Sequence, residues 1–96
     1  MGRKVIKRRT TNNHFVVKAI WDEDAEVWVA QSEEVPGLVA EADTRAHLTE
    51  KLAVLVPELL ELNGYPFDPR RPIDLVIQYR RERERREEHI RLPKAA

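Results

Sequence analysis

Four acidic side chains stand close together near residue 22 and are the first candidates for chemistry. They are Asp22, Glu23, Asp24 and Glu26. A calcium loop would add a central glycine and a terminal bidentate glutamate, and a two-metal nuclease would bring its acids together from separate strands. Neither pattern is present, because the four residues are neighbours in one polar segment. The segment therefore predicts a solvated hairpin turn and no metal site.

Nucleophiles and bases are equally sparse. The only serine, Ser32, lies in a predicted strand with no histidine near it in the sequence. The three histidines are too far apart for metal-ligand spacing: His14, His47 and His89. His47 falls in the first turn of a predicted helix, where the helix dipole disfavours a positive charge. We predict that the protein is not an enzyme and uses no cofactor.

The elements that carry these residues fit one small domain of 96 residues. β-Branched and aromatic residues predict strands over 14–22 and 27–32, which should form an antiparallel hairpin. Alternation of apolar and polar residues predicts further strands over 38–43 and 73–80. The expected order is β-β-β-α-β: an α+β fold in which an antiparallel sheet of three to four strands has one helix packed on one face.

The helix has the clearest pattern. Thr44 is a plausible N-cap, and apolar residues follow at helical spacing from Leu48 to Leu60. Pro57 removes one backbone N–H, so a kink or a division into two helices is expected. Asn63-Gly64 supplies the stop. One helix covers one sheet face, so the apolar residues on the other face need a cover. That cover is either the chain's own N-terminal arm or 65–72 loop, or the surface of a second copy or of a partner.

The charges are unevenly distributed, although the formal net charge is zero. Residues 1–10 hold five Lys/Arg and no acid, residues 11–69 hold three against twelve acids, and residues 70–96 hold nine against five. We divide the chain into a basic arm (1–13), an acidic α+β domain (14–80) and a charged tail (81–96). The interleaved acids of the tail favour a solvated extension. An acidic body attracts a basic protein. The absence of cysteine, and of any apolar run of membrane length, predicts a cytoplasmic protein.

Several segments together carry a family resemblance over about residues 14–80. These are the strand around Trp28, the Pro36-Gly37-Leu38 turn, the threonine at 44 and the helix end from Pro57 to Gly64. They resemble a bacterial domain family of unknown function related to the HicB antitoxins. The resemblance implies a partial ribonuclease-H-like fold without catalytic acids. It also implies a role like that of HicB proteins, which neutralise HicA, a small basic RNA-cleaving toxin. Residues 81–96 are too few for the DNA-binding module that such proteins usually carry.

We therefore expect a non-catalytic, HicB-like antitoxin that forms a homodimer and binds a small basic HicA-like toxin. The acids would steer the toxin and Trp28 would anchor it, although Trp28 fits ordinary sheet core equally well. The candidate partner-binding residues are Asp22, Glu23, Asp24, Trp28, Glu33 and Glu34. Two alternatives stay open: a stand-alone homo-oligomeric interaction protein, and a weak nucleic-acid binder that uses its basic ends.

Overall fold

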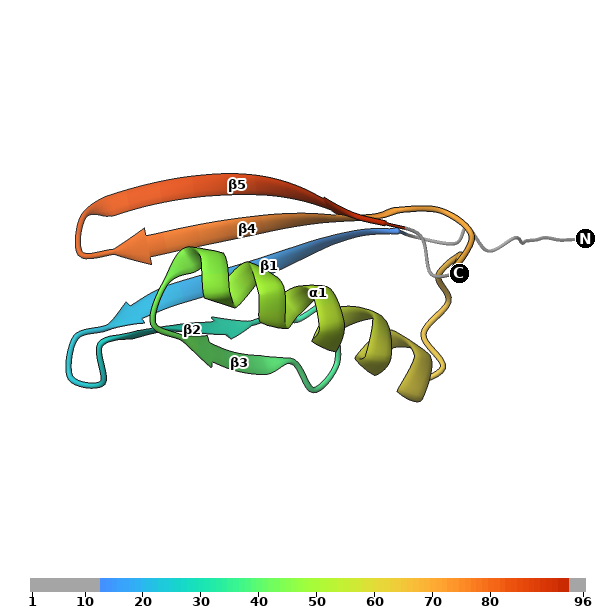
Figure 1. Cartoon of the computed structure of the whole chain (residues 1–96), viewed down its shortest axis with the longest axis horizontal. Helices are drawn as coiled ribbons and strands as arrows, with labels where there is room; N and C mark the ends of the chain where they lie inside the picture. The colour runs from blue at the N-terminus through green and yellow to red at the C-terminus, as the bar shows by residue number, and fades with distance from the viewer. Residues whose placement is uncertain (1–12, 94–96) are drawn as a thin grey trace, which may run out of the picture.

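A five-stranded sheet with one helix across one of its faces makes up the described chain (Figure 1). The computed structural model describes residues 13–93, so the predicted basic arm lies almost entirely outside the described residues. The strands lie in the order β3-β2-β1-β4-β5, with β1 at the centre. The elements are β1 (His14–Asp22), β2 (Val27–Gln31), β3 (Val39–Ala42), α1 (Arg45–Leu62), β4 (Ile73–Arg81) and β5 (Glu84–Leu92).

The fold is α+β, but the expected antiparallel sheet of three to four strands was wrong, because the sheet is mixed and has five strands. β1, β2 and β3 are antiparallel neighbours, so β3 runs in the direction of β1. The helix then returns the chain, and β4 enters beside β1 in the same direction. The two strands pair in parallel from His14↔Asp74 to Ile20↔Arg80. The chain reverses its direction an even number of times between β1 and β4, so these two strands are parallel.

The fifth strand comes from residues that the sequence placed in a solvated tail. β5 pairs antiparallel with β4 along its whole length, from Ile73↔Leu92 to Arg81↔Glu84. Glu82 makes the turn between them with a left-handed φ of 53°. In β5, Leu92 is buried in the core and Ile90 packs against it. The rest of the strand is charged and exposed, and it joins the sheet through its backbone.

The helix begins and ends where the sequence indicated. At the start of the helix, Thr44 Oγ1 accepts a hydrogen bond from the backbone N–H of His47 at 3.0 Å. At its end, the backbone N–H of Tyr65 donates to Leu60 O at 2.8 Å. Gly64 takes the left-handed φ of 63° that this ending requires. Pro57 lies inside one continuous helix, so the expected division into two did not occur. Within residues 13–93, no helix is apolar over a sufficient length to cross a membrane.

Small residues let α1 lie close to the sheet. Ala19, Ala30 and Ala40 are aligned in register across β1, β2 and β3, and all three are buried. The helix contributes Leu48, Leu52, Val56 and Leu60, each fully buried. The sheet contributes its larger side chains beside the alanine row: Phe15, Val17, Leu75 and Ile77. The core cluster therefore lies between α1 and one face of the sheet, and among residues 13–93 Val76 is the buried apolar residue outside it.

An exposed ion pair at the start of α1 gives a testable pH dependence. His47 Nδ1 lies 2.6 Å from Asp43 Oδ1. This hydrogen bond raises the pKa of His47 and lowers that of Asp43. The pair's contribution to stability is therefore complete between about pH 4 and about pH 6.5, the unfolded-state values. It is lost as the pH rises through the raised pKa of His47, and as the pH falls through the lowered pKa of Asp43.

Replacing Asp43 with asparagine is expected to lower the pKa of His47, which an NMR titration of its ring protons would measure. Glu58→Gln, at the far end of α1, is the control and should leave that pKa where it is. A His47 pKa that does not change in Asp43→Asn would show that the helix terminus, and not this pair, sets the protonation of the histidine.

Candidate functional site

The sheet face opposite α1 is the candidate binding surface. In the part of the chain that the structure describes, no helix or strand packs over it. Its apolar side chains include Ile20, which is 56% exposed, and Val39, which is 62% exposed. The 65–72 loop does not cover this face, because the Tyr65 ring packs against Phe15 on the helix side at 5.6 Å between ring centroids. Within residues 13–93, an apolar surface is therefore left open.

A groove of about 990 Å³ follows β1 and β2 on this open face. Its floor is apolar and comes from Val16, Ile20 and Val29. The lining also includes four of the six predicted partner-binding residues: Asp22, Glu23, Glu33 and Glu34. The two acidic pairs lie at opposite ends of the groove, about 20 Å apart from the rise of six strand residues. Lys18 lies between them.

Hydrogen bonds to the backbone fix the end of the groove that carries Glu33 and Glu34. β2 ends at Gln31, so the backbone of Val16 has no pairing partner in β2. Ser32 Oγ donates to Val16 O at 2.6 Å, and Glu34 Oε1 accepts from Val16 N at 2.7 Å. The sequence suggested no role for Ser32 beyond a nucleophile, yet it organises this bend. Its position directly after a strand and before two acids is the signal that was missed.

The other end of the groove is a hairpin turn. Asp22 Oδ1 accepts hydrogen bonds from the backbone N–H groups of Asp24 at 3.0 Å and Ala25 at 3.1 Å. Asp24 is therefore part of the turn and does not line the groove. Glu23 lies 3.7 Å from Arg81 Nε in an exposed pair, which contributes little to stability. The solvated hairpin turn expected from the sequence is what the structure shows.

Trp28 does not belong to this groove. It points to the helix side of the sheet, is 9% exposed, and packs edge-to-face against Trp21 and Tyr79. Of the two interpretations left open for Trp28, the structure supports sheet core. Its neighbours Val27 and Val29 face the open side, because side chains alternate along a strand. Trp21, which was not among the predicted residues, also contributes to the groove lining, but its ring lies on the helix side and packs against Trp28.

The charges of the groove suit an extended basic surface. Four carboxylates and one lysine line it, so its balance is acidic. Among residues 13–93, no three histidine or carboxylate side chains gather closely enough to hold a metal ion. The acids are spread along two rims with apolar side chains between them. This arrangement can attract positive groups over a long surface and bury apolar ones at its centre.

Comparisons with known proteins place the chain in a family. Residues 14–86 match the model of a domain of unknown function, DUF1902. A crystal structure of a hypothetical protein from the extremely thermophilic bacterium Thermus thermophilus is 44% identical. The match covers 74% of this chain and 94% of that one, with a TM-score of 0.59. No curated protein matches. Because the family match spans the sheet up to the first residues of β5 and includes both rims of the groove, the chain belongs to the DUF1902 family.

Proposed function

We propose that this domain is a non-catalytic binding protein whose open groove docks a basic protein. Its specific form would be a HicB-like antitoxin that neutralises a small, basic HicA-like ribonuclease. The observation that carries the proposal is the groove itself, in which Asp22, Glu23, Glu33 and Glu34 flank an apolar floor.

Each part of the groove contributes a different component of binding. The acidic rims raise the association rate of a basic partner and orient it before contact. The floor then supplies affinity, because Ile20 and Val29 lose water when a partner covers them. Glu34 is already held by the backbone of Val16, so part of the acidic surface is ordered before binding. A pre-ordered surface costs less entropy when it binds.

The resemblance to HicB antitoxins supplies the identity of the partner. It rests on the first hairpin, the Pro36-Gly37 turn and Thr44. These features form the hairpin beside the groove, the connection from β2 to β3 and the start of α1. A toxin that binds RNA carries a basic surface to hold phosphates. An acidic groove is complementary to such a surface and could occupy it in place of RNA.

A second candidate function, homo-oligomerisation, is favoured by the other half of the same face. Beyond β1, the open face carries Arg80, Arg85 and Arg91, with Glu87 and Asp74 as its acids. A second copy rotated about an axis along β1 would place this more basic half against the acidic groove. The homodimer and the complex with a basic partner would then compete for one surface.

Co-expression with the product of an adjacent small, basic reading frame tests the antitoxin proposal. The double variant Glu23→Lys/Glu33→Lys reverses one charge on each rim and should weaken the complex about hundredfold, as measured by titration calorimetry. The matched control is Glu58→Lys/Glu61→Lys, which makes the same charge change on residues of α1, away from the groove. That control should bind as the unaltered chain does.

The outcome separates the candidates. Loss of binding in both double variants, or in neither, would contradict docking in the groove. Sedimentation of the chain alone tests self-association, and Ile20→Asp should dissociate a dimer formed through the open face. A dimer that survives Ile20→Asp would place its interface elsewhere and leave the groove free.

A further inference from the structure

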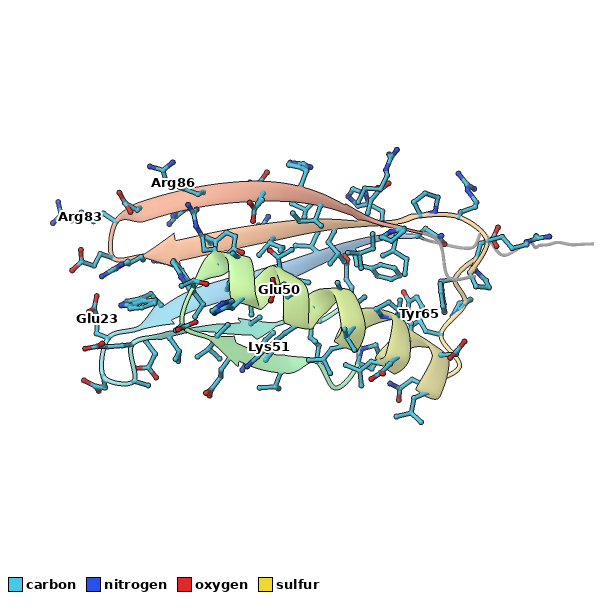
Figure 2. The ribbon with its side chains drawn as sticks, viewed as in Figure 1. Glu23, Glu50, Lys51, Tyr65, Arg83 and Arg86 are labelled. Atoms are coloured by element: carbon cyan, nitrogen blue, oxygen red, sulfur yellow. The ribbon has the colours of Figure 1, made fainter. Side chains whose placement is uncertain are left out.

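Arginines gather around the turn between β4 and β5, at the end of the sheet that also carries the β1–β2 hairpin. Figure 2 shows Arg83 and Arg86 projecting from this end, with Glu23 nearby on the other hairpin. Five of the seven residues from 80 to 86 are arginines, and Arg45 lies at the start of α1. The strands and the helix thus bring six guanidinium groups to one end of the molecule: Arg45, Arg80, Arg81, Arg83, Arg85 and Arg86.

Most of these arginines lack acidic partners. Within residues 13–93, Arg81 alone among the six forms an ion pair, the exposed contact with Glu23. Two arginines elsewhere are paired more closely, Arg70 with Asp68 at 3.3 Å and Arg91 with Asp74 at 2.8 Å. The register explains the difference, because it sets Arg80 directly opposite Arg85. Like charges in opposing positions repel, so the hairpin holds positive charge that its own acids do not offset.

Three of the arginines converge on a hollow of about 440 Å³ on the helix side of the sheet. Arg45 comes from α1, Arg81 from β4 and Arg86 from β5, and Glu84 is the acid in the lining. Trp28 and Tyr79 also line the hollow, and both are nearly fully buried. The lining therefore carries an excess of two positive charges on a rigid aromatic base.

Two of these guanidinium groups lie over aromatic rings of the cluster, and of their N–H donors only Arg81 Nε faces an acid of the described residues, Glu23 at 3.7 Å. The Arg45 guanidinium carbon lies 5.2 Å from the centroid of the Tyr79 ring, and that of Arg81 lies 4.5 Å from the Trp21 centroid. Contact with a ring face leaves the in-plane donors free. Trp21 Nε1, in the same cluster, is buried and has no hydrogen-bond partner in the described chain. Trp21 does not line the hollow, so the donors there come from Arg45, Arg81 and Arg86, and within residues 13–93 neither Arg45 nor Arg86 has an acidic partner.

We infer that this hollow, lined by Arg45, Arg81 and Arg86, is a binding site for a phosphate group. Guanidinium groups bind phosphate through paired, parallel hydrogen bonds, and the net charge of the lining matches a phosphate dianion. A second hollow of about 450 Å³, lined in part by Lys18, Arg80 and Arg85, adjoins the same hairpin. The two hollows lie on opposite faces of the sheet, because Lys18, Arg80 and Arg85 point to the open face, so the proposed site is the hollow on the helix side alone. Either a nucleic-acid strand or a free diphosphate would supply such a phosphate group.

Intrinsic fluorescence reports on the site directly, because both tryptophans of the chain belong to its aromatic cluster. Inorganic pyrophosphate and a short single-stranded RNA are each titrated into the full chain at about 50 mM salt, where phosphate contacts are strong. We expect a saturable change in emission. Arg45→Gln/Arg86→Gln should weaken binding at least about tenfold, since it removes two charged donors. Arg86→Lys should weaken binding less than Arg86→Gln does, because lysine keeps the charge but not the paired donors.

Arg83→Gln is the matched control, because Arg83 lies in the same hairpin turn and lines neither hollow. It should change the affinity less than about twofold if the hollow, and not the overall charge, binds the ligand. Equal weakening in Arg83→Gln and Arg86→Gln would overturn the site, and so would no response to either ligand. A response to pyrophosphate alone identifies a small ligand, and a stronger response to RNA identifies a strand. Toxin binding by Arg45→Gln/Arg86→Gln should be unchanged, so this inference and the antitoxin proposal can fail separately.

Discussion

A chain that ends after Glu82 is expected to lose cooperative folding, whereas a chain that ends after Pro93 should unfold as the full protein does. The shorter chain lacks β5, and β4 would become an unprotected edge beside the core. It also loses Leu92, whose burial contributes about 1.5–3 kcal/mol, and the partly buried Ile90. A domain of this size has a total stability of about 5–15 kcal/mol, so the combined loss is severe. Thermal unfolding followed by circular dichroism would measure it.

A point variant separates the role of β5 from the effect of a shorter chain. Leu92→Ala should lower the free energy of unfolding by about 2–4 kcal/mol, because Leu92 is buried against the core. Glu88→Ala, at an exposed position of the same strand, should change it by less than about 0.5 kcal/mol. A truncated chain that keeps its melting temperature would show that residues 84–92 are the solvated extension that their composition suggested.

Local signals in the sequence predicted the local parts of the fold. The first hairpin, the Thr44 cap and the Asn63-Gly64 stop each depend on residues within a few positions of one another. β5 could not be predicted in this way, because residues 81–88 contain no apolar side chain and their pairing is a property of the backbone. The reason for the strand is distant in sequence. β1 pairs with one edge of β4, so the other edge of β4 is available to β5.

The same distinction applies to charge at the helix start. The dipole of α1 disfavours a cation at His47, yet the pKa of His47 is raised. The hydrogen bond to Asp43 overrides the dipole, because a carboxylate at 2.6 Å acts more strongly than the partial charge of a helix terminus. The i,i+4 spacing of the two residues was visible in the sequence, but the contact depends on Asp43 following β3 directly, with its side chain turned toward the helix.

Sequence reasoning selected four acids that line the groove, and it left Trp28 open between a partner anchor and ordinary sheet core. The acids at both rims were selected for their charge, and the path of β1 and β2 brings them to one face. The alternation of side chains along β2 places Trp28 and Val29 on opposite faces of the sheet, but it does not show which face α1 covers. The alanines indicate that face. Because the side chains of Ala19, Ala30 and Ala40 are small and lie in register, α1 can pack close to the sheet over them. Trp28 shares a face with Ala30 and is therefore core.

Replacing Trp28 with alanine should lower the free energy of unfolding by about 3–5 kcal/mol, which urea titration would measure. The Trp28 ring lies between Trp21, at 5.2 Å, and Tyr79, at 5.0 Å, so its removal leaves a cavity and breaks two edge-to-face contacts. Val27→Ala, on the open face of the same strand, should cost less than about 1 kcal/mol.

Trp28→Phe then separates the core role from the role of an anchor. Phenylalanine keeps an aromatic ring in the cluster, so most of the stability should remain and the groove on the far side should bind its partner unchanged. A partner affinity that falls about tenfold or more in a folded Trp28→Phe protein would mean that the ring contacts the partner, which its 9% exposure on the helix side does not allow in this conformation. The same variant leaves Trp21 as the single tryptophan, directly beneath Arg81, and so isolates the ring that should respond when phosphate binds.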